Sequence, residues 1–416
     1  MVVCAPGMTD NSPLPPILGQ TKGAAKRESG KGLHVLTLTP FYPTAGDDGF
    51  GCFIAEPLPA LADVGIANTV FALRPFYYGD VKPSPSVVAA RWFRYFSLPG
   101  AFGLPTQGAF VFARIVSRVR ESQRSRPIDL IHAHAPLPAG HAAMLLSAEL
   151  GIPYVVTVHG LDAFSTNQLN GRAGEWCRRI SQRVYQSSKR VICISEHVRE
   201  QVLQRMGRSC RTSVVYNGVD PELFSPCEDP VSSASGALSI LSIGDLIPTK
   251  GFDVLLHAFA AIISEFPGLT LRIIGEGPER SRLQVLAQEL GVSGCVSFLE
   301  RRRRREIVMA MRECTLFALP SHYEGLGCVY LEAMSVGRPV IGCRGQGIAE
   351  VIDHGSDGFL VGPDNDKELA LAIAMLLRDQ GRRRNLGSAA RDTILDRFTL
   401  ARQAEQLARI YRETVA

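Results

Sequence analysis

The sequence predicts an α/β protein with two doubly wound domains, each built on a parallel sheet, that face a central cleft. Three observations support this prediction: a length of 416 residues, strand-like runs that alternate with helical stretches, and a repeat of that scheme in the second half. A chain of this length exceeds one typical core, so we expect two domains. Strands that alternate with helices favour a parallel sheet covered on both faces.

The expected strands are short runs rich in Val, Ile, Leu and Thr. In the first half they are HVLTLTP from 34, ALADVGIANTVFAL from 60, DLIHAHAP from 129, PYVVTVHG from 153 and RVICIS from 190, with helical stretches or loops between and within them. In the second half they are LSILSIGD from 238, LTLRIIGEG from 269, CVSFLE from 295, TLFALPS from 315, PVIGCR from 339 and GFLVGP from 358. We therefore expect two units of similar construction.

The stretch SPCEDPVSSASGA, at 225–237, has the small, polar and proline-containing composition of a linker. Residues 1–30 contain several prolines and glycines without the apolar core of a secretory signal, so we expect a disordered tail there. The last stretch is an amphipathic helical pattern that is expected to dock on the first domain. The expected division is a tail at 1–30, a first domain at 31–225, a linker at 226–237, a second domain at 238–399 and a C-terminal helix at 400–416.

The composition excludes several classes of protein. Hydrophobic residues make up 46% of the chain, but no run of 18 apolar residues exists to span a bilayer. The net charge of +5, from 45 basic and 40 acidic residues, is too mild to indicate nucleic-acid binding. The ten cysteines are scattered without a C-x-x-C pair, which favours a reduced, cytoplasmic protein.

The segment EGLGCVYLE, from Glu324 to Glu332, is the most informative motif. Its glycines let backbone N–H groups approach an anion, and a helix starting near Cys328 would aim its positive end at the same place. One carboxylate would then meet a sugar and the other a ribose, as a bound nucleotide-sugar requires. The alternative is a capped helix with solvated glutamates. The expected donor-binding residues here are Gly325, Leu326, Gly327, Cys328, Val329 and Glu332.

Two further loops follow strands of the second half. In GDLIPTKG, Lys250 stands just before a helix, where a diphosphate would meet a cation and free N–H groups, although a solvated lysine fits the loop alone equally well. The loop lacks the Walker spacing, which disfavours triphosphate hydrolysis. The G-x-G of RIIGEGPER lacks the third glycine and the downstream acid of a dinucleotide fingerprint, so we interpret it as a tight turn.

Three histidines and a glycine loop mark the first domain. His159 ends a buried strand and should project into the cleft, where its imidazole could donate to a sugar hydroxyl or a phosphate; a structural role is the alternative. His132 and His134 share one face of a strand, but no third ligand accompanies them, so packing is favoured over a metal site. Gly49 and Gly51, in a long loop after the first strand, would let the backbone approach an acceptor or phosphates, or form only a surface turn.

Taken together, these residues resemble the family 4 group of glycosyltransferases, which are retaining enzymes with the GT-B fold that use nucleotide-sugars. The resemblance extends from about Leu33 over nearly the whole chain. Its carriers are FYP at 41–43, IHAH at 131–134, VHGLD at 158–162, ISE at 194–196, YNGVD at 216–220, TKGFDVLL at 249–256, IIGEGPER at 273–280, EGLGCVYLEAM at 324–334 with GRPVI at 337–341, and GQGIAEVIDHGSDGFLV at 345–361. It implies two Rossmann-like domains, of which the first binds the acceptor and the second the nucleotide-sugar.

The resemblance also implies roles for individual residues. Glu324 would contact the transferred sugar, Glu332 the ribose and Lys250 the diphosphate. His159 would act at the sugar or reaction centre, and Gly51 would belong to the loop near the phosphates and the acceptor.

One position departs from the family pattern. The family usually has arginine directly after the glycine of the phosphate loop, and Asp245 stands there in this chain. A carboxylate about 4 Å from a phosphate charge is repelled by about 4 kcal/mol at an effective dielectric near 20. Asp245 is therefore expected to point away or to be neutralised. We hypothesise that Arg301, Arg302 or Arg303 supplies the missing positive charge.

The expected activity is retaining transfer of a hexosyl group from a UDP-type or GDP-type sugar to a saccharide or lipid-linked acceptor, in polysaccharide or glycolipid synthesis. No cofactor or metal is expected to be obligatory. Segment 91–126 mixes aromatics with arginines, as a helix at the inner membrane surface would, but an ordinary amphipathic helix packed on the sheet is favoured over that hypothesis. The alternatives are a non-catalytic nucleotide-sugar-binding protein, because of Asp245, and a glycoside hydrolase with Glu324 and Glu332 as its acids.

Overall fold

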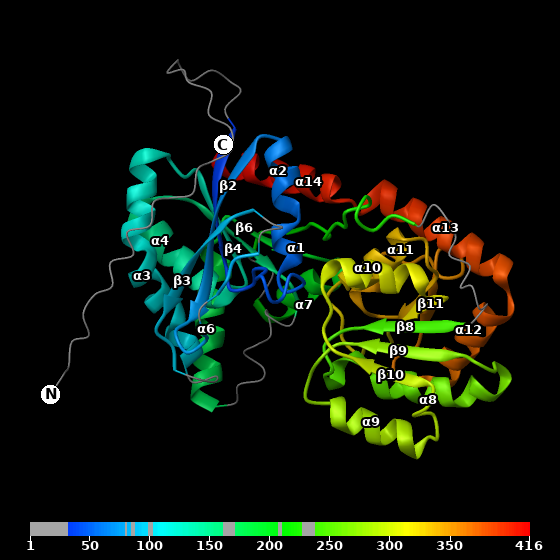
Figure 1. Cartoon of the computed structure of the whole chain (residues 1–416). Helices are drawn as coiled ribbons and strands as arrows, with labels where there is room; N and C mark the ends of the chain where they lie inside the picture. Colours follow the sequence, from blue (N-terminus) through cyan, green and yellow to red (C-terminus); the bar gives the residue numbers. More distant parts are fainter. Residues whose placement is uncertain are drawn as a thin grey trace.

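The computed structural model of the chain describes residues 32–79, 81–84, 88–98, 103–160, 171–206, 210–226 and 238–416. The tail expected at 1–30 and most of the expected linker, at 227–237, lie outside the described residues. The described residues form two parallel-sheet α/β domains, which lie side by side in Figure 1. The predicted fold class is therefore confirmed.

The N-terminal domain is built on a seven-stranded sheet with the order β3-β2-β1-β4-β5-β6-β7, in which neighbouring strands pair in parallel. The strands are β1 Leu33–Thr39, β2 Ile66–Pro75, β3 Ala90–Tyr95, β4 Leu130–His134, β5 Tyr154–Val158, β6 Arg190–Cys193 and β7 Thr212–Val214. Every residue of β4 and β5 is buried, because helices cover both faces of the sheet.

The helices of this domain follow the strands. They are α1 Cys52–Ala55, α2 Pro57–Asp63, α3 Leu104–Ser125, α4 His141–Leu150, α6 Gly171–Ser187 and α7 Glu196–Met206. A π-type turn, η2 Pro136–Gly140, precedes α4.

The segment 91–126 is not one helix. Its first part belongs to β3, where Trp92 pairs with Ala72 of β2, and α3 begins only at Leu104. Helix α3 buries Val111, Ile115 and Val119, which lie at four-residue spacing on the face that packs against β3 and α4. Residues 91–98 are therefore not part of a helix, whereas α3 is the amphipathic helix packed on the sheet that the sequence favours over a membrane-surface helix. Within the described ranges, no helix combines the length and hydrophobicity needed to cross a bilayer.

The C-terminal domain is built on a six-stranded sheet with the order β10-β9-β8-β11-β12-β13, again paired in parallel. The strands are β8 Ser239–Ile243, β9 Thr270–Ile274, β10 Val296–Leu299, β11 Leu316–Ala318, β12 Val340–Cys343 and β13 Phe359–Val361. The helices and turns are η4 Pro248–Lys250, α8 Phe252–Ile262, η5 Ile263–Glu265, α9 Arg280–Glu289, α10 Arg304–Glu313, α11 Cys328–Ser335, η6 Gly347–Glu350, α12 Asp366–Arg378 and α13 Gln380–Arg397.

The strand order reverses once in each sheet, between β1 and β4 and between β8 and β11. In open parallel sheets, ligands bind beyond the carboxyl ends of the strands at such a reversal, because the following loops diverge there and leave a crevice. The glycine loop follows β1 and His134 ends β4, whereas Lys250 follows β8 and Glu324 follows β11. The topology thus brings the predicted site residues of each domain to one place.

The chain returns to the N-terminal domain at its end. Helix α14, Leu400–Val415, packs against α2 and buries Leu407, Ile410 and Tyr411 (Figure 1). Just before it, the chain runs beside residue 219: Val219 N–H donates to Phe398 O at 2.9 Å, and Leu400 N–H donates to Val219 O at 3.1 Å. The two chain segments that connect the domains are therefore hydrogen-bonded to each other.

Candidate functional site

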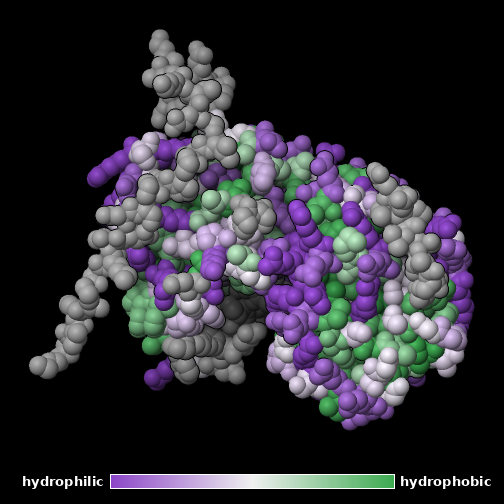
Figure 2. Space-filling view, viewed as in Figure 1, coloured by the Kyte–Doolittle hydropathy of each residue, from purple (hydrophilic) through white to green (hydrophobic). Residues whose placement is uncertain are grey.

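A cavity of about 440 Å³ lies between the two domains and is lined by residues of both. Figure 2 shows the molecule hollowed between its two halves, with hydrophilic residues on the C-terminal side of the hollow. The lining includes the glycine loop after β1, the loops after β8 and β11, and the start of α10. The cavity therefore opens where the strand orders reverse.

The loop after β11 leads directly into α11, as predicted. Gly327 has φ 86°, a left-handed conformation that favours glycine, and α11 begins at Cys328. Gly325 is pressed against the other domain: a Cβ there would lie 2.9 Å from the His159 carbonyl oxygen, and Ser195 Oγ donates to Gly325 O at 2.5 Å. This loop is thus held by backbone contacts that leave no room for a side chain.

Lys250 and Glu324 form an ion pair at the edge of the cavity. The Lys250 Nζ and Glu324 Oε2 atoms are 2.6 Å apart, and the two side chains are 19% and 12% exposed. Gly251 makes the turn that places the lysine, since it has φ 65° and a Cβ there would lie 2.1 Å from the Pro320 carbonyl oxygen. Both charged groups face the cavity and are positioned to meet an anionic, hydroxylated ligand.

Glu332 lies deeper, on the first turns of α11, and is 3% exposed. Its Oε1 accepts from Arg304 Nη1 at 2.5 Å, whereas Oε2 is buried and has no hydrogen-bond partner among the described residues. Burial raises the pKa of the Glu332 carboxyl, and the Arg304 charge opposes that rise. A buried acceptor without a partner is costly, and a ligand hydroxyl would satisfy it.

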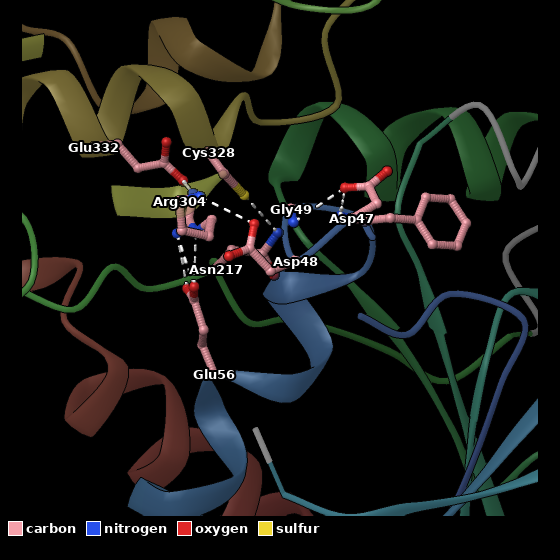
Figure 3. Close-up of polar contacts among 9 residues, drawn as sticks. Asp47, Asp48, Gly49, Glu56, Asn217, Arg304, Cys328 and Glu332 are labelled. Atoms are coloured by element: carbon pink, nitrogen blue, oxygen red, sulfur yellow. Dashed lines mark hydrogen bonds and ion pairs between the residues drawn. The ribbon is translucent and has the colours of Figure 1, made fainter. Parts of the chain in front are cut away.

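Arg304 is the residue that the sequence analysis missed. It is the first residue of α10, and its guanidinium contacts Glu332 and, across the domain boundary, Glu56 (Figure 3). Five consecutive arginines look equivalent in the sequence. The start of α10 decides which of them turns inward, and no sequence signal marks that position.

The other arginines of the run divide between roles. Arg301 Nη2 donates to Asp245 Oδ1 at 2.7 Å and Arg301 Nη1 donates to Asp47 Oδ2 at 3.0 Å, so Asp245 is neutralised, one of the two outcomes expected for it. Arg302 pairs with Glu306 at 3.3 Å and also lines the cavity. Arg303 precedes α10 and does not line the cavity.

The glycine loop of the N-terminal domain forms the opposite wall. Gly51 has φ 74°, and a Cβ there would lie 2.5 Å from the Phe41 carbonyl carbon, which explains the glycine. Asp47 Oδ1 accepts from the N–H groups of Gly49 and Phe50 at 3.2 and 3.0 Å, which fixes the turn. This wall is formed mainly by aromatic rings and glycine backbone.

His159 follows β5 and stands behind that wall rather than on it. Its ring stacks on His134 with centroids 5.2 Å apart, and His159 Nε2 lies 3.0 Å from His134 Nδ1, so one ring donates to the other. The Phe53 ring, which lines the cavity, lies 4.8 Å from the His159 ring. Burial lowers the pKa of His159 to about 3, so its imidazole is neutral near pH 7.

The row of histidines continues away from the cavity. His132 Nδ1 lies 2.7 Å from Tyr411 Oη, and its Nε2 lies 2.6 Å from Thr157 Oγ1. Burial lowers the pKa of His132 to about 3. Both ring nitrogens have protein partners, as a packing role requires. Within the described residues, no group of three or more His, Cys, Asp or Glu side chains is arranged to hold a metal ion.

The predicted site residues fall into two sets. Those that line the cavity are Gly51, Lys250, Arg301, Arg302, Glu324, Gly327, Cys328, Val329 and Glu332. Those that do not are His159, Gly325, Leu326 and Arg303, of which Leu326 is fully buried. Burial raises the pKa of the Cys328 thiol to about 12, so this residue lines the cavity as a neutral group.

Two family models match the chain. Residues 53–223 match the family described as Glycosyltransferase Family 4, and residues 229–393 match Glycosyl transferases group 1. The D-inositol 3-phosphate glycosyltransferase of Corynebacterium glutamicum (strain R) is 30% identical over 399 residues, which are 90% of this chain and 94% of that protein. An uncharacterized glycosyltransferase of Methanocaldococcus jannaschii is 28% identical over 290 residues, 70% of this chain and 76% of the other.

Solved structures share the fold. Sucrose-phosphate synthase from Thermosynechococcus elongatus aligns with a TM-score of 0.75 at 22% identity, covering 92% of this chain and 98% of that one. HepE of Anabaena in complex with UDP-glucose aligns with a TM-score of 0.72 at 23% identity, covering 92% and 100%. The matched families span both domains, and the site residues lie where the topology places a ligand. The chain therefore belongs to the family 4, group 1 glycosyltransferases and has the GT-B fold.

Proposed function

We propose that this glycosyltransferase moves a hexosyl group from a nucleotide-diphosphate sugar to an acceptor hydroxyl with retention of configuration. The observation that carries the proposal is the strip from Glu324 to Glu332, which lines the cavity with the Lys250–Glu324 ion pair and with Glu332, whose buried Oε2 has no partner among the described residues. Proteins of similar fold are described in complex with UDP and with UDP-glucose, which favours a uridine donor over GDP.

The proposed roles follow from the chemistry of each group. Lys250 and the N–H groups at the start of α11 stabilise the negative charge of the departing diphosphate. Glu324 accepts from the sugar hydroxyls and Glu332 Oε2 from the ribose. The bond from the anomeric carbon to the diphosphate breaks, the acceptor oxygen bonds to the same face, and the acceptor proton passes to the leaving phosphate. His159, which is neutral, orients the acceptor side by contact with Phe53.

Three measurements test this reaction. Thermal shift with UDP, GDP and ADP hexoses should show the largest stabilisation with the UDP sugar, since a ligand that binds only the folded state raises its stability. Product anomer analysis should show retention, and activity should persist in excess chelator. Inversion, or activity that is lost on chelation and restored by magnesium, contradicts the proposed mechanism.

The alternative of a non-catalytic binding protein makes a different prediction. In that case Glu324→Ala would leave the function intact, and nucleotide would never be released on addition of acceptor. Acceptor-dependent release of UDP, which disappears in Glu324→Ala, supports the transferase. Because relatives are named for D-inositol 3-phosphate, the acceptor screen should include phosphorylated cyclitols beside saccharides and lipid-linked sugars.

An exposed aromatic cluster supports contact with a membrane that carries a lipid-linked acceptor. Five rings with exposures of 40–50% touch in series at the carboxyl ends of β2 and β3 and on α3: Phe76, Tyr77, Tyr78, Phe96 and Phe110. Arg74 lies 5.2 Å from the Tyr78 ring. Exposed apolar patches edged by cations favour anionic lipid surfaces.

This contact has a direct test. At low salt the protein should sediment with vesicles of anionic phospholipid, and Phe96→Ser should weaken that binding. A protein that stays in the supernatant at low salt excludes the membrane role and leaves the transferase proposal untouched.

A further inference from the structure

Arg304 joins the two domains through three separate contacts. Its Nε and Nη2 donate to the two carboxylate oxygens of Glu56, at 2.9 and 3.0 Å, and its backbone N–H donates to Asp48 Oδ1 at 3.0 Å. Its remaining nitrogen, Nη1, donates to Glu332 Oε1 (Figure 3). Glu56 and Asp48 belong to the N-terminal domain, whereas Glu332 belongs to the strip proposed to hold the donor.

The arginine is also enclosed. Its side chain is 12% exposed, the side chains of Glu56 and Glu332 are 18% and 4% exposed, and its Cζ lies 4.7 Å from the centre of the Phe224 ring. Water screens such a cluster less than it screens a surface ion pair. The single positive charge of Arg304 is shared by Glu56 and Glu332, so loss of one contact changes the electrostatic interaction of the arginine with the other carboxylate.

The shape of the guanidinium links the two glutamates. The group is planar and rigid, and its fork fits a carboxylate in a bidentate manner. Glu56 occupies the edge formed by Nε and Nη2, which fixes the plane of the group and therefore the direction of Nη1. That direction determines that Oε1 of Glu332 is engaged, and it leaves the buried Oε2 of this cavity-lining side chain without a partner among the described residues.

We propose that Arg304 is a positioning residue for the donor and that Glu56 of the N-terminal domain, through Arg304 and Glu332, sets the affinity of the donor domain for its nucleotide. The inference rests on the proposed role of Glu332 toward the ribose. Glu56 touches no part of the donor in this scheme. The nucleotide is held tightly only while the two domains are apposed, because that contact completes the Arg304 fork.

The test measures UDP binding by calorimetry and the kinetics with the UDP sugar. Glu56→Gln keeps the shape but removes the charge, and the donor KM and the UDP Kd should rise about tenfold while kcat stays within about threefold, the size expected for a charge-assisted hydrogen bond. Arg304→Lys, which keeps the charge but lacks the planar fork that fits Glu56 in a bidentate manner, should show the same rise. The matched controls are Asp63→Asn on α2 and Arg305→Gln on α10, both exposed, which should change neither value.

The pH dependence gives a readout that a merely structural role would not move. In Arg304→Met, no positive charge opposes the effect of burial, so the pKa of Glu332 should rise further. Donor affinity should then begin to fall at a higher pH as the solution is acidified. Arg304→Lys keeps the charge and should show only a slight shift. Thermal unfolding of each variant checks that it is folded. If Arg304→Met does not fold, Arg304→Lys and Glu56→Gln carry the same test.

A double-mutant cycle separates this inference from the function on which it rests. In the Glu332→Gln background, Glu56→Gln should cause no further loss of UDP affinity, because Glu56 acts only through Glu332. If Glu332→Gln weakens UDP binding and Glu56→Gln does not, or if their effects add, the inference is overturned and the proposed function survives. If Glu332→Gln itself leaves UDP binding unchanged, the proposed ribose contact fails.

Discussion

The two walls of the cavity differ in chemistry. The C-terminal wall carries charge: Lys250 pairs with Glu324, and Glu332 is held by Arg304. The N-terminal wall presents mainly aromatic rings and glycine backbone, and the histidines behind it are buried and neutral. The first wall suits a diphosphate and sugar hydroxyls, and the second suits an uncharged acceptor alcohol.

The difference indicates that the charged groups of this site are concentrated on the C-terminal wall. On that wall, Lys250 is paired with Glu324 and Arg304 with Glu332, so a donor that binds as proposed would have to exchange with the first of these contacts. The imidazoles of His132 and His159, behind the N-terminal wall, keep one protonation state through the neutral range. Substitutions in the two walls should therefore fail in different ways.

The largest effect is expected at Glu324. Glu324→Gln should lower kcat at least about a hundredfold, because the carboxylate contact with the sugar contributes mainly in the transition state, as single preorganised groups do elsewhere. Turnover under saturating donor measures it. Glu300→Gln, which changes an exposed glutamate after β10, is the control. An unchanged kcat in Glu324→Gln would contradict a catalytic role for this carboxylate.

The next effect is expected at Lys250. Lys250→Met should weaken UDP binding about tenfold to a hundredfold, since a charge-assisted hydrogen bond to the diphosphate is lost. Calorimetry with UDP measures the change, and uridine alone should bind wild type and variant equally. The exposed Lys367→Met on α12 serves as the control. Equal losses for uridine and UDP would place Lys250 away from the diphosphate.

The buried histidines behind the N-terminal wall should make the free energy of unfolding depend on pH. Burial lowers the pKa of His132 and His159 to about 3, whereas the unfolded chain takes up a proton near pH 6.5. The unfolded state therefore binds more protons below pH 6.5, and stability is lost as the pH falls toward 3, by about 2 kcal/mol per histidine between pH 7 and 5.

Urea unfolding at pH 7 and pH 5 measures this loss. His159→Gln should reduce the difference between the two pH values by about 2 kcal/mol, whereas His257→Gln, which removes an exposed histidine of α8, should not. If wild type and His159→Gln lose the same stability on acidification, the imidazole is not held neutral behind the wall.

The smallest effect is expected where the walls meet. In Gly325→Ala the new Cβ would lie 2.9 Å from the His159 carbonyl oxygen, so the loop must shift. Thermal unfolding should show a midpoint lower by about 2–4 °C, from about 1 kcal/mol of overpacking, with a drop in kcat/KM of about tenfold. Gly294→Ala, where a Cβ meets nothing within 4 Å, should change neither. Equal behaviour of the two variants contradicts a close approach at Gly325.

Much of the fold could be predicted from local patterns. Each run expected to be a strand contains one, because continuous Val, Ile and Leu in short segments between turns fit a sheet covered on both faces. Strands β3 and β7 were missed. The residues of β3, ARWFRY, mix aromatic and basic side chains at the edge of the sheet, and the same composition continues into α3.

The site was predictable where a loop and a helix start share a few consecutive residues. The strip from Glu324 to Glu332 is such a case, because glycine geometry and helix polarity are local properties. Arg304 was not predictable, since its partner Glu56 lies 248 positions away and only the packing of two domains brings them together. Asp245 likewise found its counter-ion in Arg301 through a contact between different loops.

The hydrogen bonds between Val219 and the backbone at 398–400 tie both interdomain crossings into one strap. A single connecting segment would let one domain rotate in any direction relative to the other. Two hydrogen-bonded segments resist twisting, so they allow hinge bending about one axis more easily than rotation about others. The halves of this enzyme would then open and shut along one path, and each closure would return Glu56 to the same arginine.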